Sequence, residues 1–409
     1  LSHLPLAQTP TRILTTKNYL LVTSKIAGSL DIYDKYNLTL LKKIHIGGNP
    51  SGITYISEKD VVYVPDLLQG MINVISLAQL SIINKIDMGS TATLTESVIF
   101  DENYEFGYVP QTYQNTDNQN LQFDTAVFPS LSIINLKTNE NLRKRRLGLD
   151  IVDQPVGIPL TGLIFNGYLF IANYASNDLS ILYLDTLTLA AHIELGFTPF
   201  GLATDKKNEL VLVNNTLDET ISIIDGNSLA LIEHIKVAEM DESSQLIQGQ
   251  RLFNNSDDPR LAKDQWIACA TCHFEGGNDG ASWFFPDGKR NTPSLFNSVQ
   301  TAPFHWNGDL NEIQDVEFTI QDLMAGHGLS GGQPNCTPNC SLDKSNAGRS
   351  DDLAALANYV NSLQFPIAFT QMSALANFSA YTNGKAIFES EETECITCHT
   401  PPNYTDNKN

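Results

Sequence analysis

The sequence Cys269-Ala270-Thr271-Cys272-His273 returns as Cys395-Ile396-Thr397-Cys398-His399 near the end of a chain of 409 residues. Two cysteines separated by two residues, with a histidine directly after them, form the attachment pattern of a c-type haem. The thiols bind the haem covalently and the imidazole becomes an axial ligand of the iron. The sequence therefore predicts two covalently bound c-type haems, the first on Cys269, Cys272 and His273 and the second on Cys395, Cys398 and His399.

Two other readings of a C-x-x-C pair fit less well. A structural zinc site normally has its two pairs ~12 to 20 residues apart, whereas Cys269 and Cys395 are 126 positions apart (395 − 269). A redox pair of the thioredoxin kind opens a helix after a strand in a βαβ unit, and the flanking sequence does not have that pattern. Zinc and thiol redox chemistry remain the minor alternatives.

Upstream of the first motif, one short apolar strand recurs five times. The intervals between successive central residues are 42, 59, 48 and 42 positions, and these residues are Ile32, Val74, Ile133, Ile181 and Ile223. Four-stranded propeller blades repeat every ~40 to 50 residues. Residues 1–240 are therefore predicted to form an all-β propeller with five visible blades, with a β-sandwich as the main rival.

The repeats carry a second marker, a Pro two residues before a Gly, as in Asn49-Pro50-Ser51-Gly52-Ile53 and Thr198-Pro199-Phe200-Gly201-Leu202. Together with Leu21-Val22-Thr23-Ser24 and Ile223-Ile224-Asp225, the repeats resemble the YVTN family of β-propellers. Relatives often close with seven blades. The ring is therefore small, or the strand near Arg12-Ile13-Leu14 completes a blade, or further blades lie outside this sequence.

Two polar segments interrupt the repeats. Residues 111–120 form an insertion without an apolar period, which is either a solvated loop or a loop that contacts the haem-binding part or a partner. Residues 143–146, Arg-Lys-Arg-Arg, are a cationic cluster in an acidic chain. We expect a solvated blade edge there rather than a docking patch.

From about residue 241 the apolar period changes from that of strands to that of helices. Ser243 or Ser244 can cap a helix that leads through Gly249-Gln250-Arg251-Leu252-Phe253 to the first haem motif. Gly384-Lys385-Ala386-Ile387-Phe388 precedes the second motif in the same way, and a further helix is expected over 352–363. The sequence thus predicts two all-α cytochrome c folds in tandem, over 241–370 and 371–409. The second is incomplete, so we expect the native polypeptide to continue beyond Asn409.

The order of motifs in this region resembles that of the bacterial di-haem cytochrome c peroxidases and of the related di-haem enzyme that matures methylamine dehydrogenase. The resemblance rests on 249–253, 269–273, Arg290-Asn291-Thr292-Pro293-Ser294-Leu295 and Trp306-Asn307-Gly308-Asp309, and covers about 241–409. It implies an oxidoreductase that reduces hydrogen peroxide or oxidises a partner through high-valent haem iron, with the second haem as the point of electron entry.

The resemblance also implies roles for single residues. Trp306 matches a tryptophan that lies between the two haems and carries electrons, although Asn307 replaces the usual Asp; plain packing is the alternative. Gln314 and Glu317 lie in the segment that handles peroxide protons, but their spacing does not match, and a helix surface is the alternative. Relatives commonly hold a calcium ion between the haem units.

The second axial ligand of the first haem is left open. In the peroxidases a histidine soon after the first motif can bind this iron, whereas here no histidine occurs before His305. His305, Met324 and His327 are the candidates, and an open iron site also fits. An open site favours peroxide chemistry, whereas two strong axial ligands favour an electron carrier whose propeller docks a partner.

Composition narrows the partners and the compartment. A net charge of −21 argues against binding of nucleic acid or anionic membrane, and no apolar run is long enough to span a bilayer. Covalent haem attachment in bacteria occurs outside the inner membrane, so we expect an exported protein of the periplasm or cell surface. Its partner is a redox protein or a small electron donor.

Cys336 and Cys340 suit a local disulfide in that compartment, or two free thiols.

Overall fold

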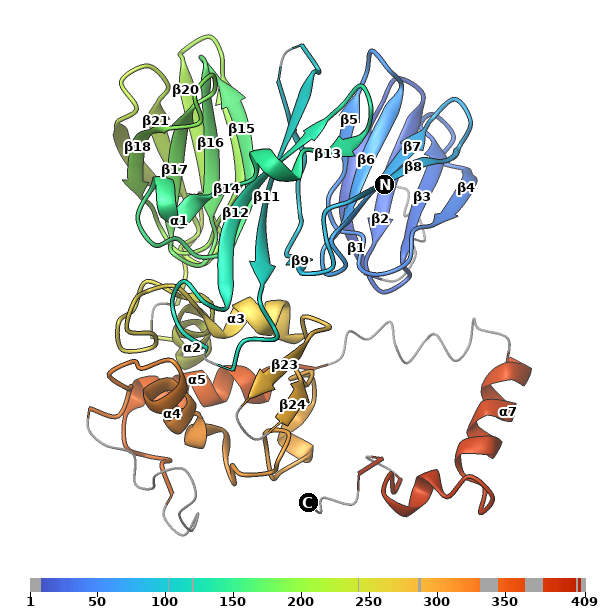
Figure 1. Cartoon of the computed structure of the whole chain (residues 1–409), viewed down its shortest axis with the longest axis vertical. Coiled ribbons are helices and arrows are strands. Elements are labelled where there is room, and N and C mark those ends of the chain that lie inside the picture. The colour runs from blue at the N-terminus through green and yellow to red at the C-terminus, as the bar shows by residue number, and fades with distance from the viewer. Residues whose placement is uncertain are drawn as a thin grey trace.

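A computed structural model describes residues 9–331, 345–364 and 378–405, apart from residues 102, 120, 242, 286, 287, 402 and 403. Its N-terminal part consists of five antiparallel sheets in chain order (Figure 1). The strands of the first two are β1 (Pro10–Thr15), β2 (Tyr19–Ser24), β3 (Ser29–Asp34) and β4 (Leu40–His45), then β5 (Thr54–Ile56), β6 (Val61–Asp66), β7 (Met71–Ser76) and β8 (Ser81–Asp87).

The third sheet has six strands and the last two have four each. The third holds β9 (Ala92–Thr93), β10 (Ile99–Phe100), β11 (Phe106–Gln114), β12 (Val127–Asn135), β13 (Glu140–Asn141) and β14 (Leu147–Gly148), followed by the short helix α1 (Leu149–Val152). The fourth holds β15 (Pro159–Phe165), β16 (Tyr168–Asn173), β17 (Asp178–Tyr183) and β18 (Leu189–Glu194), and the fifth β19 (Pro199–Asp205), β20 (Leu210–Asn215), β21 (Thr220–Asp225) and β22 (Leu231–Lys236). The five recurring strands predicted from the sequence are β3, β7, β12, β17 and β21.

Neighbouring sheets pack face to face through four apolar clusters. One cluster joins the first sheet to the second, and three more join the second to the third, the third to the fourth and the fourth to the fifth. Because both faces of the inner sheets are covered, β6 is buried along its whole length and β16 nearly so. Such strands are continuous apolar runs rather than alternating ones.

The edges of the sheets nearest the common axis contact one another around a ring. Hydrogen bonds join Thr11 to Pro50, Thr95 to Leu67, Ser97 to Leu160 and Thr161 to Phe200. The Arg12 guanidinium of the first sheet lies 4.5 Å from the centre of the Phe200 ring of the fifth, and its Nη2 pairs with Glu96 Oε1 of the third sheet at 2.7 Å. Five sheets around one axis are the arrangement of propeller blades, whereas a sandwich would have two packed sheets. We call β1 to β22 the β ring.

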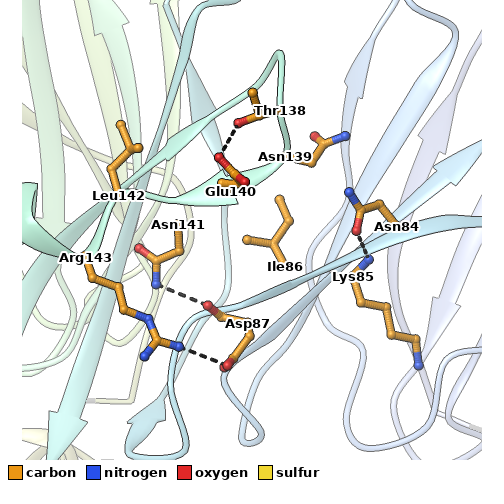
Figure 2. A pocket seen from close by; sticks show the side chains of 10 residues that line it. All are labelled: Asn84, Lys85, Ile86, Asp87, Thr138, Asn139, Glu140, Asn141, Leu142 and Arg143. Atoms are coloured by element: carbon orange, nitrogen blue, oxygen red, sulfur yellow. Dashed lines mark hydrogen bonds and ion pairs between the residues drawn. The ribbon is translucent and has the colours of Figure 1, made fainter.

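The cationic cluster of residues 143–146 braces the β ring. It forms the short helix η1 (Arg143–Arg145), exposed at the junction of the second and third sheets. Arg143 Nη2 pairs with Asp87 Oδ2 at 2.9 Å, across a pocket between β8 and β13 (Figure 2). The guanidinium groups of Arg145 and Arg146 lie 4.6 Å and 4.1 Å from the ring centres of Phe106 and Tyr113. The cluster is exposed, as expected, but three of its members make contacts within the ring.

The helical region follows the β ring and lies against one end of it (Figure 1). It contains α2 (Gln245–Asn254), α3 (Cys269–Cys272), η2 (Phe274–Gly276), the hairpin β23 (Ser282–Phe285) and β24 (Gly288–Asn291), η3 (Ser298–Gln300), η4 (Ile313–Asp315), α4 (Val316–Phe318), η5 (Thr319–Leu323) and α5 (Asp351–Ser362). The helices are few and short and a hairpin lies between them, so the all-α expectation holds only in part. The further segments are α7 (Phe378–Phe388) and η6 (Cys395–Thr397).

Helices α2 and α5 form the core of the helical region. They approach so closely that a Cβ at Gly249 would overlap the Ala355 carbonyl oxygen and lie 2.8 Å from Tyr359 Cβ. Phe253 of α2 meets Tyr359 of α5 edge to face at 5.1 Å between ring centres. The Ser350 hydroxyl accepts a hydrogen bond from Leu353 N at 3.1 Å and so caps α5. This pair of helices forms the apolar wall behind the first haem motif.

Candidate haem sites

The first motif is a single helical turn. His273 N donates to Cys269 O at 2.9 Å, and Ala268 N donates to Thr271 Oγ1 at 3.1 Å at the start of the turn. One turn therefore brings Cys269, Cys272 and His273 close together. Neither cysteine forms a disulfide. Two free thiols beside an imidazole are the donor set that covalent haem attachment needs.

The orientation of the His273 ring suits an iron ligand. Its Nδ1 lies 3.2 Å from the Gly277 carbonyl oxygen. Because a carbonyl can only accept, Nδ1 carries the hydrogen, and Nε2 keeps the lone pair that binds a metal. Burial lowers the pKa of His273, which favours the neutral imidazole required for coordination.

Burial also marks the thiols of the first motif. It raises the pKa of Cys269 to about 11, and burial followed by the charge of Asp279 raises the pKa of Cys272. Cys269 packs against the apolar cluster that includes Phe253 and Val360. Cys272 packs against a second cluster that includes Trp266 and Trp283. The motif thus borders two apolar cores, while both cysteines and His273 stay half-buried.

The second motif has the same local geometry without that cover. His399 N donates to Cys395 O at 3.0 Å, and His399 Nδ1 lies 3.0 Å from the Tyr404 carbonyl oxygen, which again leaves Nε2 as the ligating atom. The Phe388 ring, from the preceding helix α7, is 5.8 Å from the His399 ring. However, none of the residues of η6 is buried, and both Cys398 and His399 are exposed. Figure 1 places this motif apart from α3.

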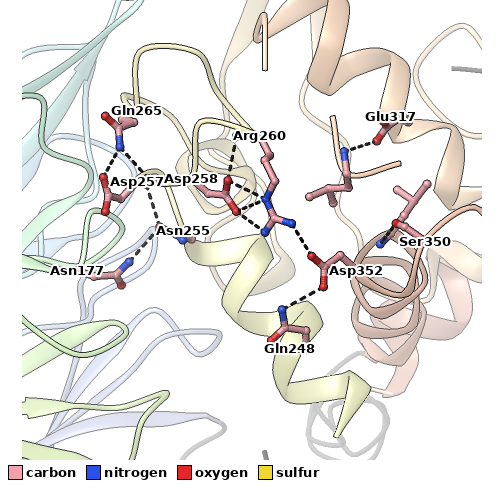
Figure 3. A network of polar contacts seen from close by, with 12 residues as sticks. Asn177, Gln248, Asn255, Asp257, Asp258, Arg260, Gln265, Glu317, Ser350 and Asp352 are labelled. Carbon is pink, nitrogen blue, oxygen red and sulfur yellow. Dashed lines mark hydrogen bonds and ion pairs between the residues drawn. The ribbon is translucent and has the colours of Figure 1, made fainter. Parts of the chain in front are cut away.

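Charged side chains fasten the segment before the first motif to α5. Arg260 pairs with Asp258 and with Asp352 of α5, both at 2.7 Å (Figure 3). Asp352 also accepts from Gln248 of α2 at 3.2 Å. On the other side, Asn255 accepts from Asn177 of the β ring at 3.0 Å. The network positions α2, α5 and the loop that leads to Cys269.

The three candidate axial ligands lie in different surroundings. His305 is held by Asp309 at 2.9 Å from Nδ1 and by Thr319 at 3.3 Å from Nε2. Met324 packs against the same apolar cluster as Cys272. His327 has an exposed side chain. Apolar packing therefore brings Met324 toward the first motif, whereas the described contacts of His305 and His327 do not reach it.

The three predicted catalytic residues also lie in different environments. Trp306 is 62% exposed, and Gln314 is partly buried in η4. Glu317 is fully buried instead of lying on a helix surface. Its carboxylate accepts from Gln321 Nε2 at 2.7 Å, Leu329 N at 3.0 Å, Ser330 N at 3.1 Å and Ser330 Oγ at 2.6 Å. Both oxygens thus hold the loop at 328–330 in place.

Sequence reasoning missed Asp279 and Trp283. Asp279 is 5% exposed, and its Oδ2 accepts from Trp283 Nε1 at 2.9 Å, inside the cluster that contains Cys272. An Asp six residues after a haem histidine carries no motif signal of its own. Only the packing of the hairpin β23–β24 against α3 reveals its position.

Three further expectations concern disulfides, metals and membranes. Cys336 and Cys340 lie outside the described residues. Among the residues that are described, no group of three or more His, Cys, Asp and Glu side chains could hold a metal ion, so the calcium expectation gains no support. Within the same part of the chain, every helix is too short or too polar to cross a membrane.

Comparison with known proteins identifies the region around the first motif. Residues 243–330 match the family "Di-haem cytochrome c peroxidase". Over 88 residues the chain is 33% identical to cytochrome c551 peroxidase of Pseudomonas aeruginosa, covering 19% of this chain and 24% of that protein. The chain thus spans about a quarter of the length of this curated relative. Kuenenia stuttgartiensis hydrazine synthase superposes with a TM-score of 0.37 at 14% identity, over 52% of this chain and 81% of that one.

Proposed function

We propose that this protein is a di-haem c-type cytochrome with peroxidase-like activity, which reduces hydrogen peroxide or oxidises a redox partner. The observation that carries the proposal is the family match over 243–330, because it contains the first motif together with every candidate axial ligand and catalytic residue. The second haem-binding motif lies outside the match. Its support is the shared ring orientation of His273 and His399.

A haem bound at these motifs would supply iron for electron transfer and, where a coordination position is open, for peroxide reduction. The thiols of Cys269 and Cys272 would anchor it, and His273 Nε2 would bind the iron. Hydrogen bonding of Nδ1 to the Gly277 carbonyl raises the basicity of that imidazole. The two apolar clusters beside Cys269 and Cys272 would help to keep water from a haem attached there.

The other roles follow from placement. His305, tethered through both ring nitrogens, is the candidate for a displaceable axial ligand, with Met324 as its competitor. The exposed indole of Trp306 is the candidate for carrying electrons between the two haems. Gln314 is the more accessible proton donor or acceptor. Glu317 already uses both oxygens to hold its loop, so its role in proton transfer requires that loop to move.

A second function is an electron carrier with both irons fully ligated, in which the β ring serves partner docking. In that case recruitment of His305 to the iron through Nε2 would replace its hydrogen bond to Thr319 and keep the one from Nδ1 to Asp309. Either function places the protein outside the inner membrane, in the periplasm or at the cell surface, with a redox protein or a small electron donor as partner.

Low-temperature electron paramagnetic resonance with and without hydrogen peroxide separates the two functions. We expect a high-spin ferric signal that changes on addition of peroxide, and we expect it to disappear in Cys269→Ala/Cys272→Ala. The matched variant Cys395→Ala/Cys398→Ala should keep this signal and lose the other haem. Two low-spin signals that ignore peroxide would refute the enzyme and support the carrier.

A further inference from the structure

The longest strands of the β ring reach into the helical region. Strands β11 and β12 have nine residues each, and the loop between them extends to the hairpin β23–β24 (Figure 1). Phe284 N donates to Thr116 O at 2.8 Å. Leu121 and Phe123 of this loop pack in the cluster that holds Trp283 and Cys272. Residues 111–114 of the polar insertion are the buried end of β11, so the loop expectation is wrong for them, whereas Thr116 contacts the hairpin near the first haem motif, as the second of the two expectations has it.

One side chain of this insertion donates a hydrogen bond to a buried carboxylate. Gln114, the last residue of β11, donates from Nε2 to Asp279 Oδ2 at 3.0 Å. The same oxygen accepts from Trp283 Nε1 at 2.9 Å, and Oδ1 accepts from Ala281 N at 2.9 Å. Gln114 and Asp279 are both 5% exposed. One donor of the three therefore comes from the β ring and two come from the helical region.

Asp279 borders the groups that would hold the first haem. It follows His273 by six residues, and its indole partner Trp283 packs in the same cluster as Cys272. Its charge acts on both the Cys272 thiol and the His273 ring. A buried negative charge acts strongly on a nearby iron because the surrounding dielectric is low. At an iron held by His273 it would stabilise the ferric state relative to the ferrous state.

We propose that Gln114 is a positioning residue through which the β ring sets the reduction potential of the first haem, by holding and partly neutralising the Asp279 carboxylate. Hydrogen bonds and charge around a haem are established levers on its potential. The inference rests on the proposed function only in requiring a haem at Cys269 and Cys272. It gives the β ring a role at the haem itself rather than only as a scaffold.

The test is a spectroelectrochemical titration of the full two-haem chain, in which the Cys395→Ala/Cys398→Ala variant identifies the first haem's wave. Gln114→Leu removes one donor from the carboxylate, so the negative potential at the iron grows and the midpoint potential should shift downward. Asp279→Asn removes the charge and should shift the potential upward. In the Asp279→Asn background, Gln114→Leu should add no further downward shift.

Arg251→Met is the matched control for loosened docking. Arg251 binds Leu217 O at 3.1 Å and Asp218 at 2.9 Å on the β ring, away from Asp279, so its loss weakens the same junction at another point. A potential in Gln114→Leu that stays constant or rises would overturn the inference. The inference would also be overturned if Arg251→Met lowered the midpoint potential as much as Gln114→Leu does. The same holds if Gln114→Leu lowered it as much in the Asp279→Asn background as in the unsubstituted chain. Absence of Soret absorption from the unsubstituted chain would overturn the haem attachment, and hence the proposed function, as well.

Discussion

The two haem motifs share one local geometry and differ in their surroundings. Each is a single turn in which the histidine Nδ1 is bound to a carbonyl four or five residues downstream, Gly277 for His273 and Tyr404 for His399. The first turn lies between two apolar clusters and beside the β ring, whereas the residues of η6 are not buried. The pentapeptide and the residues after it thus set the ring orientation, while the pocket depends on segments distant in sequence.

The strongest test of this contrast is thiol labelling of the haem-free chain. Burial raises the pKa of Cys269 to about 11 from an ordinary value of 9.0, which lowers its thiolate fraction at pH 8 about a hundredfold. Cys398 is exposed. Cys269, Cys272 and Cys395 are half-buried. We therefore expect iodoacetamide to modify Cys398 at least ~tenfold faster than Cys269, with peptide mass spectrometry as the readout.

Urea provides the control for this experiment. Once unfolded, the four cysteines should react at similar rates, because burial no longer distinguishes them. Raising the pH from 8 to 9 in the folded chain should speed the reaction of Cys269 about tenfold, since its pKa lies above both values. Equal rates for the two motifs in the folded chain would show that the first motif is not embedded.

A second test exchanges the glycine that precedes each motif. A Cβ at Gly249 would overlap Ala355 of α5, whereas a Cβ at Gly384 would meet nothing within 4 Å. Overpacking a core typically costs about 1–3 kcal/mol. In the 409-residue chain, Gly249→Ala should therefore lower the free energy of unfolding by about 1–3 kcal/mol. Gly384→Ala should be neutral or stabilising by up to about 1 kcal/mol, because Ala favours helix.

Denaturant titration followed by circular dichroism measures both variants. The pair is matched in local sequence, since each glycine opens a Gly-x-x-x-Phe segment, 249–253 or 384–388, that precedes its own motif. If Gly384→Ala costs as much as Gly249→Ala, the helix α7 has a packing partner of its own and the contrast between the motifs fails. If neither variant changes stability, the close approach of α2 and α5 is wrong.

The sequence predicted the features that depend on local patterns. The repeat spacing located the third strands around Ile32, Val74 and Ile181, because four-stranded blades repeat every ~40 to 50 residues. Periodicity likewise indicated the helices over 245–254 and 351–362. The contact between the first and fifth sheets could not be predicted in this way. It depends on contacts such as Arg12 with Phe200, about 190 positions apart.

The residues of the candidate site also divide into those predicted from local sequence and those brought together only by the tertiary structure. The motif cysteines and histidines are evident from spacing alone, whereas Asp279, Trp283 and Gln114 are brought together only by the approach of β11 to the hairpin. Glu317 is the opposite case, a residue whose sequence pattern suggested an environment that it does not have. Its position in a helical pattern suggested a surface or an acid–base role, but its burial depends on the loop at 328–330, which has no apolar period of its own.

The smallest expected effect concerns the cap of α5, the helix that encloses only the first motif. The Ser350 hydroxyl accepts from Leu353 N at 3.1 Å, and loss of an N-cap typically costs about 1 kcal/mol. In the Cys395→Ala/Cys398→Ala background, denaturation followed by the Soret band reports the first site alone. There Ser350→Ala should lower the free energy of unfolding by about 1 kcal/mol.

Ser362→Ala is the control. It removes a hydroxyl that bonds only the Tyr359 carbonyl in its own helix, at 2.6 Å, and should change the free energy of unfolding by no more than about 0.5 kcal/mol. If the two substitutions lowered the free energy of unfolding equally, the start of α5 would not contribute to the pocket. The first motif would then be covered by α2 and the β ring alone.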